Sequence, residues 1–407
     1  MKIVLAYSGG LDTSVALKWL KEKYKAQVIT YTTNLGKGTD RKNIEEKAKK
    51  TGASKVYVED LRREFANEFI LPALKAGALY EKKYPLATAL SRPLIARRLV
   101  EIATEEGADA VAHGCSGKGN DQVRFELTIF SFAPDLKIIA PLREWEFKSR
   151  EEEIEYAKKN NIPVSTTKKS PYSIDENIWG TSIECGILEN PNQEPPEDAW
   201  TITKSINDTP ASPKYIKIYF ENGVPKKLNG DKYELASLII ELNSIGAKHG
   251  VGRIDMVENR LVGIKSRELY EAPAAVILHK ALGEIESLTL DRETLHFKEM
   301  ISSKYAELVY YGLWYSNLKE SLDAFLNNVH QDTTGEVTLK LHRGNCIVTG
   351  RESPNSLYNE KMATYSPQDI FSHQSAKGFI ELFGLPLKIQ ALKRLEKQRK
   401  KKLSATT

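Results

Sequence analysis

The residue types that bind phosphate are concentrated in one stretch near the N-terminus. Gly9 and Gly10 follow the apolar run Ile3–Tyr7 and precede a segment whose apolar residues have helical spacing. Paired glycines allow a tight turn and let backbone N–H groups approach a ligand, and the helix N-terminus behind them favours an anion. Hydroxyl donors accompany the turn at Ser8, Thr13 and Ser14. We interpret the stretch as a phosphate cradle rather than a plain strand-to-helix turn.

The motifs that the chain lacks narrow the phosphate chemistry. Neither G-x-x-x-x-G-K-[ST] nor G-x-G-x-x-G after a strand is present. Ser8–Ser14 instead resembles the S-G-G-x-D-[ST] loop of the ATP pyrophosphatase families, in which the loop grips the β- and γ-phosphates. The resemblance implies that ATP is cleaved between its α- and β-phosphates while a substrate oxygen is adenylated. The substrate stays open, because these families include synthetases and tRNA-modifying enzymes.

A second cluster of polar residues, Gly114–Arg124, follows an apolar run that predicts a strand. Its three glycines mark a tight loop, and its side chains include an amide, a carboxylate and a guanidinium. Asp121 can accept from an ammonium group, and Arg124 can bind a carboxylate through two parallel hydrogen bonds. This combination suits a zwitterionic amino acid better than an apolar ligand. The alternative is a glycine-rich turn with solvated charges.

Two later segments are rich in donors and acceptors. Tyr172–Ser182 has an aromatic residue toward each end, and Lys248–Arg260 ends in charged residues, with Lys265–Glu271 close behind. Taken alone, each segment fits surface salt bridges as well as it fits a binding site.

Together the four segments resemble the argininosuccinate synthase family in order and spacing, from Ile3 to about Tyr358. The resemblance implies an ATP-consuming ligase that joins citrulline to aspartate through a citrulline adenylate and releases AMP and pyrophosphate. It also implies a cytoplasmic homotetramer. ATP is expected as a substrate accompanied by Mg²⁺, which would bridge its phosphates.

The resemblance also implies roles for individual residues. The expected ATP contacts are Ala6, Tyr7, Ser8, Gly9, Gly10, Leu11, Asp12, Thr13, Ser14, Thr33 and Gly114. The expected aspartate contacts are Ser116, Asn120 and Asp121. The expected citrulline contacts are Tyr84, Asn120, Arg124, Ser173, Ser182, Glu258 and Tyr270. Asp12 and Asp121 are the expected catalytic residues, with Asp121 either helping to deprotonate the aspartate amine or anchoring it. Arg92 is a further candidate carboxylate anchor.

One departure from the family pattern concerns citrulline. The family usually reads G-T-S-x-A-R-P where this chain has Ala87–Pro93. Ala89 therefore lacks a hydroxyl that normally touches citrulline, and Ser91 stands two residues further on.

The elements that position these residues follow from the hydrophobic pattern. Apolar, β-rich runs alternate with helical patterns over the first 165 residues, as at Val28–Thr32, Val56–Val58, Ala110–His113 and Ile138–Pro141. Such alternation predicts an α/β fold with a doubly wound parallel sheet. Ligands bind these sheets beyond the carboxyl ends of the strands. Helices are expected near Leu11–Leu20, at about Leu94–Glu106 and after Ser149.

The pattern of expected secondary structure changes near Thr166. A long irregular connection at Asn190–Pro213 precedes a strand at Tyr215–Phe220 and a helix at about Tyr233–Gly246, a mixture typical of an α+β region. We therefore expect a nucleotide-binding domain at residues 1–165 and a synthetase domain at 166–360. A linker at Thr364–Ala376 would lead into the helix of a C-terminal arm, 361–407, that mediates oligomerisation.

Composition excludes several classes of protein. The chain has 407 residues, 41% of them hydrophobic, and no apolar run long enough to span a membrane. Its three cysteines are far apart, which argues against disulfides or a protein-built metal site and for a reducing compartment. The local charge from Lys388 to Lys402 is +7, the balance of eight basic residues and one acidic residue. Leucines at helical spacing favour an amphipathic helix over nucleic-acid binding there.

Two other functions remain open. One is an enzyme of the same loop class that acts on tRNA, although the chain lacks the paired cysteines of the sulfur-transfer versions. The other is a non-catalytic nucleotide sensor, against which the intact Ser8–Ser14 loop argues. Release of pyrophosphate only when citrulline and aspartate are both present would separate all three.

Overall fold

The computed structural model describes residues 1–36, 38, 40–147, 149–163 and 171–404. The chain forms two compact units, Met1–Asn355 and Ser356–Thr407. The expected domain boundary between residues 165 and 166 lies outside the described residues.

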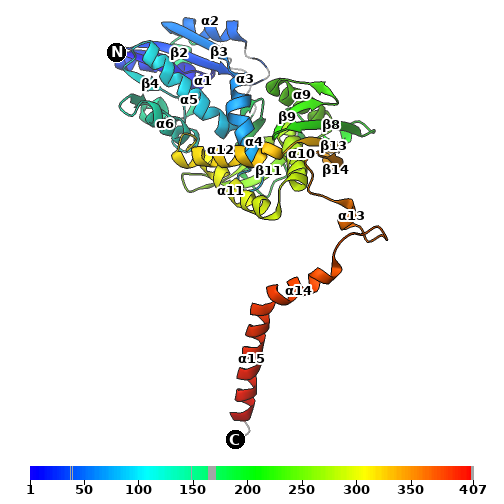
Figure 1. The fold of residues 1–407 in the computed structure, drawn as a ribbon. Coiled ribbons are helices and arrows are strands. Elements are labelled where there is room, and N and C mark those ends of the chain that lie inside the picture. The colour runs from blue at the N-terminus through cyan, green and yellow to red at the C-terminus, as the bar shows by residue number, and fades with distance from the viewer. Residues whose placement is uncertain (37, 39, 148, 164–170, 405–407) are drawn as a thin grey trace. The chain divides into compact units, whose positions relative to one another are not determined.

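The N-terminal part of the first unit is built on a five-stranded parallel sheet, drawn in blue to teal in Figure 1. All neighbouring strands in it pair in parallel, in the order β3-β2-β1-β4-β5. The strands are β1 (Lys2–Ala6), β2 (Gln27–Asn34), β3 (Lys55–Asp60), β4 (Ala110–Ala112) and β5 (Lys137–Ile139). The five strands expected from the apolar runs are therefore confirmed.

Helices cover both faces of this sheet because side chains alternate along each strand. Ile3 and Leu5 of β1 pack with Leu17 of helix α1, whereas Val4 packs on the opposite face with Leu99 of helix α5. The doubly wound arrangement is thus confirmed. The surrounding helices are α1 (Leu11–Tyr24), α2 (Arg41–Thr51), α5 (Ala87–Glu105), α6 (Asp121–Phe132), α7 (Pro141–Glu144) and α8 (Arg150–Lys159).

The strand order changes direction between β1 and β4. From β1 the chain moves outward to β2 and β3, and it then returns to place β4 and β5 on the other side. The loops that follow β1 and β4 therefore diverge around one crevice, where sheets of this kind bind ligands. These loops are the predicted phosphate cradle and the Gly114–Asn120 segment, and a Cβ atom on Gly114 would lie 3.0 Å from Cγ2 of Thr13.

Local signals set some helix boundaries and fail at others. Ser149 caps α8 by accepting a hydrogen bond from the Glu152 N–H at 3.3 Å, as its spacing predicts. The start expected at Leu94 is wrong, since α5 begins at Ala87 and contains Pro93. Burial explains this difference, because Ala89 and Leu90 are fully buried and tertiary packing holds the turn before the proline.

The rest of the first unit adds two antiparallel sheets, and the expected α+β character is observed. The four-stranded sheet has the order β11-β12-β7-β6, and the five-stranded sheet has the order β10-β9-β8-β13-β14. The first contains β6 (Ser173–Asn177), β7 (Gly180–Glu184), β11 (Arg253–Asn259) and β12 (Lys265–Glu271). The second contains β8 (Lys214–Glu221), β9 (Val224–Leu228), β10 (Asp231–Lys232), β13 (Gly335–His342) and β14 (Asn345–Glu352).

The largest hydrophobic core joins these sheets to a segment from earlier in the chain. Phe69 and Leu90 belong to the same buried cluster as Trp179, Leu278 and Tyr310. Its helices include α3 (Arg62–Glu64), the π-helical turn Phe65–Ile70, α4 (Leu71–Ala76), α9 (Leu235–Lys248), α10 (Pro273–Thr289), α11 (Arg292–Tyr310) and α12 (Asn317–Val329). Residues 61–94 thus pack with the later part of the chain, and this brings Tyr84 and α5 to the four-stranded sheet.

The second unit contains α13 (Glu360–Ala363), α14 (His373–Phe383) and α15 (Leu385–Ser404). The expected tail helix is confirmed, but α14 begins inside the stretch expected to be a linker. Asp369 orders that start by accepting hydrogen bonds from the Phe371 N–H at 2.7 Å and from His373 at 2.8 Å. Among the described residues, no helix is long and apolar enough to cross a bilayer.

Candidate active site

A cavity of about 740 Å³ opens at the crevice between β1 and β4. One wall is formed by the loops after these strands, and another by the four-stranded antiparallel sheet. The expected ATP contacts that line it are Ala6, Tyr7, Ser8, Asp12, Thr13, Thr33 and Gly114. The expected amino-acid contacts that line it are Tyr84, Ser116, Asn120, Asp121, Arg124, Ser173, Ser182, Glu258 and Tyr270. Gly9, Gly10, Leu11 and Ser14 belong to the same loop but do not line the cavity.

The phosphate loop is ordered by its own hydroxyl groups. Gly9 has φ +75°, a left-handed conformation that favours glycine, whereas Gly10 has φ −76° and caps α1. The Ser8 and Thr13 hydroxyl oxygens lie 3.0 Å apart, and the Gly10 N–H donates to the Ser8 hydroxyl at 3.3 Å. The Ser14 hydroxyl lies 3.0 Å from the Tyr7 hydroxyl. Hydroxyl groups and the α1 N-terminus thus converge, as binding of an anion requires.

Two acidic side chains and the Thr33 hydroxyl lie next to this loop. Burial, followed by the neighbouring Asp12 carboxylate, raises the pKa of Glu153 in α8 to about 7. The Glu153 carboxyl group is hydrogen-bonded to Asp12, and the Thr33 hydroxyl is buried next to Tyr31. The loop is therefore bordered by a pair of neighbouring carboxyl groups and by Thr33, which lines the cavity.

The loop after β4 is held by the side chains of His113, which lines the cavity, and Gln122, which does not. The Cys115 N–H donates to His113 Nδ1 at 3.3 Å, so His113 Nε2 carries the proton and donates to Glu126 at 3.2 Å. Gln122 Nε2 donates to the Gly117 carbonyl at 2.7 Å and to the Gly119 carbonyl at 3.2 Å. These contacts fix Ser116 and Asn120 at the cavity edge without using their own side chains.

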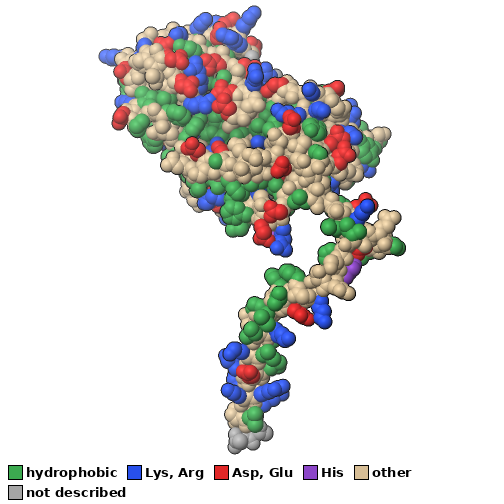
Figure 2. Space-filling view, in the orientation of Figure 1, with side chains coloured by type: hydrophobic (Ala, Val, Ile, Leu, Met, Phe, Trp, Pro, Cys, Tyr) green, Lys and Arg blue, Asp and Glu red, His purple; other side chains and the backbone are tan. Residues whose placement is uncertain are grey.

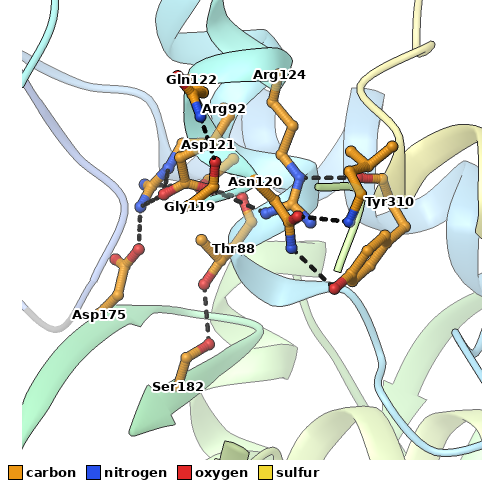
Figure 3. A network of polar contacts seen from close by, with 12 residues as sticks. Thr88, Arg92, Gly119, Asn120, Asp121, Gln122, Arg124, Asp175, Ser182 and Tyr310 are labelled. Carbon is orange, nitrogen blue, oxygen red and sulfur yellow. Dashed lines mark hydrogen bonds and ion pairs between the residues drawn. The ribbon is translucent and has the colours of Figure 1, made fainter. Parts of the chain in front are cut away.

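Asp121 lies between two arginines (Figure 3). Its carboxylate accepts from Arg92 Nε at 2.9 Å and from Arg124 NH1 at 2.9 Å, and Arg92 also pairs with Asp175. Burial alone would raise the pKa of Asp121, but the two guanidinium groups outweigh it and hold the pKa below its ordinary value. Asp121 is therefore an ionised carboxylate that can accept from an ammonium group.

Arg124 is only 3% exposed and has an unsatisfied donor. Its Nε donates to the Tyr310 carbonyl at 3.0 Å and its NH1 to Asp121, while its NH2 is buried and has no acceptor among the described residues. An unpaired guanidinium nitrogen in a buried site is costly unless a ligand completes it. A carboxylate ligand would supply that acceptor.

Two tyrosine hydroxyls hold the carboxylate of Glu258. The Tyr270 hydroxyl donates to Oε2 at 2.6 Å, and the Tyr310 hydroxyl donates to Oε1 at 2.5 Å. Burial raises the pKa of Glu258, although these hydrogen bonds oppose the shift. The Tyr84 ring stacks on the Tyr270 ring with centroids 4.0 Å apart. An anionic group with rigid aromatic neighbours is thus presented to the cavity.

The region of the missing hydroxyl is filled by neighbouring residues. Ala89 is fully buried and does not line the cavity, whereas Thr88 and Ser91 do. The Thr88 hydroxyl lies 2.9 Å from the Ser182 hydroxyl (Figure 3), and the Ser91 hydroxyl donates to the Thr88 carbonyl at 2.8 Å. A hydroxyl pair at the cavity wall is therefore retained despite Ala89.

Several lining residues are absent from the sequence-based expectations. Arg260 pairs with Glu184 and with Glu268, to which the distance is 2.6 Å. Burial, followed by the Glu184 charge, raises the pKa of Glu268 to about 8. Asp175 also lines the cavity and lies inside the Tyr172–Ser182 segment. Charge density in these segments was the available signal, but it did not show which charged residues would face inward.

Within the residues that the structure describes, no group of three or more His, Cys, Asp or Glu side chains could hold a metal ion. Two carboxyl groups, Asp12 and Glu153, do lie beside the phosphate loop.

Two family models match the chain. Residues 2–163 match the model described as Arginosuccinate synthase N-terminal HUP domain, and residues 172–390 match the Arginosuccinate synthase C-terminal domain.

Two relatives that align over nearly their whole length are both named argininosuccinate synthase. A protein of Pelodictyon phaeoclathratiforme, named argininosuccinate synthase, is 58% identical over 387 residues, which cover 95% of this chain and 97% of the relative. A protein of Geobacillus thermodenitrificans with the same name is 59% identical and covers 99% of this chain and 98% of its own length. Among solved structures, a predicted subunit of a tRNA methyltransferase from Methanocaldococcus jannaschii aligns with 38% of this chain and 76% of its own. That alignment has 22% identity and a TM-score of 0.28, which is too weak to bear on function.

Proposed function

This chain belongs to the argininosuccinate synthase family, and we propose that the cavity at the β1/β4 crevice is its active site. The enzyme is a carbon–nitrogen ligase that converts ATP, citrulline and aspartate to AMP, pyrophosphate and argininosuccinate. The observation that supports the site is convergence, since one cavity is lined both by the phosphate loop and by the expected amino-acid contacts.

The reaction has two steps because the ureido group of citrulline is a poor electrophile. The ureido oxygen attacks the α-phosphorus of ATP, and pyrophosphate leaves. The amine of aspartate then attacks the ureido carbon of the citrulline adenylate, and AMP leaves with the former ureido oxygen. The protein's main tasks are alignment of the reactants and neutralisation of the developing charge.

ATP is assigned to the loop side of the cavity. The backbone of Ser8–Gly10 and the hydroxyls of Ser8 and Thr13 would bind the β- and γ-phosphates. Thr33 and Gly114 would contact the nucleotide, and their place in the cavity lining supports this role. With pyrophosphate held there, the α-phosphate would face the amino-acid side of the cavity.

The two amino acids are assigned to the sheet side. Ser116, Asn120 and Asp121 would bind aspartate, and the free NH2 of Arg124 would bind the carboxylate of citrulline. The remaining citrulline contacts proposed are Tyr84, Asn120, Ser173, Ser182, Glu258 and Tyr270. The lowered pKa of Asp121 and its two arginine partners favour an anchor for ammonium over a general base.

The residues beside the phosphate loop also fit the expected cation. Mg²⁺ is usually held by one or two carboxylates together with substrate phosphates, and Asp12 supplies a carboxyl group in the cavity, with Glu153 as its neighbour. The ion would reduce the charge of the phosphates and so ease attack on the α-phosphorus. Asp12 would hold the cation-bound pyrophosphate in place.

The route of one oxygen atom tests this assignment. Citrulline labelled with heavy oxygen at the ureido position should yield labelled AMP, because that oxygen becomes bonded to the α-phosphorus. Mass spectrometry of the products measures the label. Label in inorganic phosphate, or ADP as the nucleotide product, would show activation through the γ-phosphate and contradict the placement of ATP. Omitting aspartate is the control, since net formation of AMP requires it.

The assembly is proposed to be a cytoplasmic homotetramer in which residues 361–407 form the oligomerisation arm. Domains at residues 1–165 and 166–360 would carry the nucleotide and amino-acid sites. The three cysteines are free thiols, which agrees with a reducing compartment. Within the second unit, Figure 2 shows hydrophobic side chains along α14 and α15, and Phe379, Phe383 and Leu387 are 63%, 75% and 68% exposed. Such faces normally bury against a partner.

Deleting Asp369–Thr407 is therefore expected to shift the protein to smaller species, as measured by light scattering. Gln390→Asp, a substitution of one polar residue by another in α15, is the control and should leave the mass of the assembly unchanged. A tetramer that persists after the deletion would refute the arm.

A further inference from the structure

Tyr310 is a buried residue whose side chain connects several proposed substrate contacts without lining the cavity itself. It is the last residue of α11, some 190 positions from the Gly114–Arg124 segment with which it interacts. No motif in the sequence marks it.

The phenol of Tyr310 joins two proposed contacts directly. It donates to Glu258 Oε1 at 2.5 Å and accepts from Asn120 Nδ2 at 2.8 Å (Figure 3 shows the contact with Asn120). The other end of the Asn120 amide is also fixed, because its Oδ1 accepts from the Leu261 N–H at 2.9 Å. The phenol therefore helps to fix the Glu258 carboxylate, together with Tyr270, and the Asn120 amide, together with Leu261.

The backbone of Tyr310 holds a third contact. The last carbonyls of a helix have no partner within it, and that of Tyr310 accepts from Arg124 Nε at 3.0 Å. Gly312 follows with φ +76°, and a Cβ there would lie 2.8 Å from the Arg124 Cα. Glycine thus permits the close approach of α11 to α6. The Arg124 guanidinium also lies over the Tyr310 ring, 4.8 Å from its centroid.

From these contacts we propose that Tyr310 is a positioning residue for citrulline, which sets the orientation of Asn120, Arg124 and Glu258 without touching the substrate. The inference rests on the proposed assignment of those three residues to citrulline. Their geometry is fixed before substrate arrives, and preorganisation of this kind lowers the cost of binding. The ring itself is locked by stacking on Tyr80, with centroids 3.6 Å apart.

The main test is Tyr310→Phe, which removes only the hydroxyl and keeps the ring and the backbone carbonyl. The KM for citrulline should rise about tenfold or more, the effect of losing a hydrogen bond to a charged group. The KM for ATP should change much less.

Tyr305→Phe is the matched control. Tyr305 lies on the same helix, is equally buried, and donates to Asp323, a carboxylate outside the cavity, at 2.8 Å. Its kinetics should match those of the wild type. Equal changes in the two KM values for Tyr310→Phe, or the same kinetic loss in both variants, would mean a structural role and overturn the inference. Wild-type protein that releases no pyrophosphate with citrulline and aspartate would instead overturn the proposed function.

A pH profile gives a readout that a loss of packing would not produce. The charged and titratable groups around Glu258 are Tyr80, Tyr84, Arg124, Arg260, Glu268, Tyr270 and Tyr310. The Tyr310 hydroxyl lowers the pKa of Glu258, so its loss should raise that pKa. Because the ionised carboxylate is the form that accepts from citrulline, affinity is lost as pH falls through the pKa. The acidic rise in the KM for citrulline should therefore begin at higher pH in Tyr310→Phe.

A second variant keeps the test decisive if Tyr310→Phe folds poorly. Tyr310→3-fluorotyrosine retains the hydroxyl and makes it a stronger donor, which should move the acidic rise to lower pH. An acidic limb that stays in place would overturn the inference.

Discussion

Replacing Gly10 with valine is expected to slow pyrophosphate release about 100-fold or more, as loss of preorganised donors to a developing charge does, while the protein remains folded. A branched side chain would stand where the backbone N–H groups must approach the phosphates. The readout is the rate of pyrophosphate release with saturating citrulline and aspartate.

Gly10 is a better site for this substitution than the adjacent Gly9. Gly10 has φ −76°, which valine can adopt, and its Cβ would meet only the Ser8 hydroxyl, at 3.3 Å. A substitution at Gly9 would add backbone strain, because φ there is +75°. Gly10→Val thus separates access of the phosphate from folding.

Gly283→Val is its matched control. Gly283 is an exposed glycine in α10, and a Cβ there would meet no atom within 4 Å. This variant should keep wild-type activity, and thermal unfolding should show both proteins folded. Near-normal pyrophosphate release from folded Gly10→Val protein would refute the phosphate cradle.

Replacing Arg124 with lysine should raise the KM for citrulline about 10- to 100-fold, equivalent to roughly 1.5–3 kcal/mol, the range for hydrogen bonds to charged groups. Lysine keeps a charge near Asp121 but cannot reproduce the planar fork that reaches Tyr310, Asp121 and a ligand together. Loss of the free NH2 donor should affect the KM for citrulline most. The measurement is the KM for each of the three substrates.

Arg267→Lys controls for the general cost of removing a two-point arginine. Arg267 binds both oxygens of Asp255, at 2.9 and 2.6 Å, and does not line the cavity. Its citrulline KM should stay near that of the wild type. Equal increases in the KM values for citrulline and ATP in Arg124→Lys would show that Arg124 supports the fold and does not bind citrulline.

Much of the fold could be predicted because the pattern and the packing agree. In the parallel sheet, apolar runs buried on both faces mark the central strands, and the alternation of strands and helices fixes its class. The start of α5 could not be predicted, since Pro93 argues locally for an interruption and only the burial of Ala89 and Leu90 overrides it.

The candidate site could likewise be predicted only in part. Asp12, Asn120 and Arg124 lie in compact motifs whose residue types indicate phosphate or amino-acid binding. Tyr310 and Arg260 act through partners distant in sequence or through facing strands, and no local pattern carries that information. Pairing of Arg260 with Glu184 depends on the four-stranded sheet, which forms only when the β6–β7 and β11–β12 hairpins come together.

The long span between α11 and the Gly114–Arg124 loop also bears on the order in which the enzyme can form. Contacts between distant parts of a chain require loop closure, whose entropy cost must be overcome before the contacts stabilise the fold. Such contacts therefore tend to form late. The phosphate loop needs only neighbouring residues and the adjacent strands. The citrulline pocket needs the carbonyl at the end of α11 to reach Arg124, 186 residues earlier. We therefore expect a refolding chain to bind nucleotide before it binds citrulline.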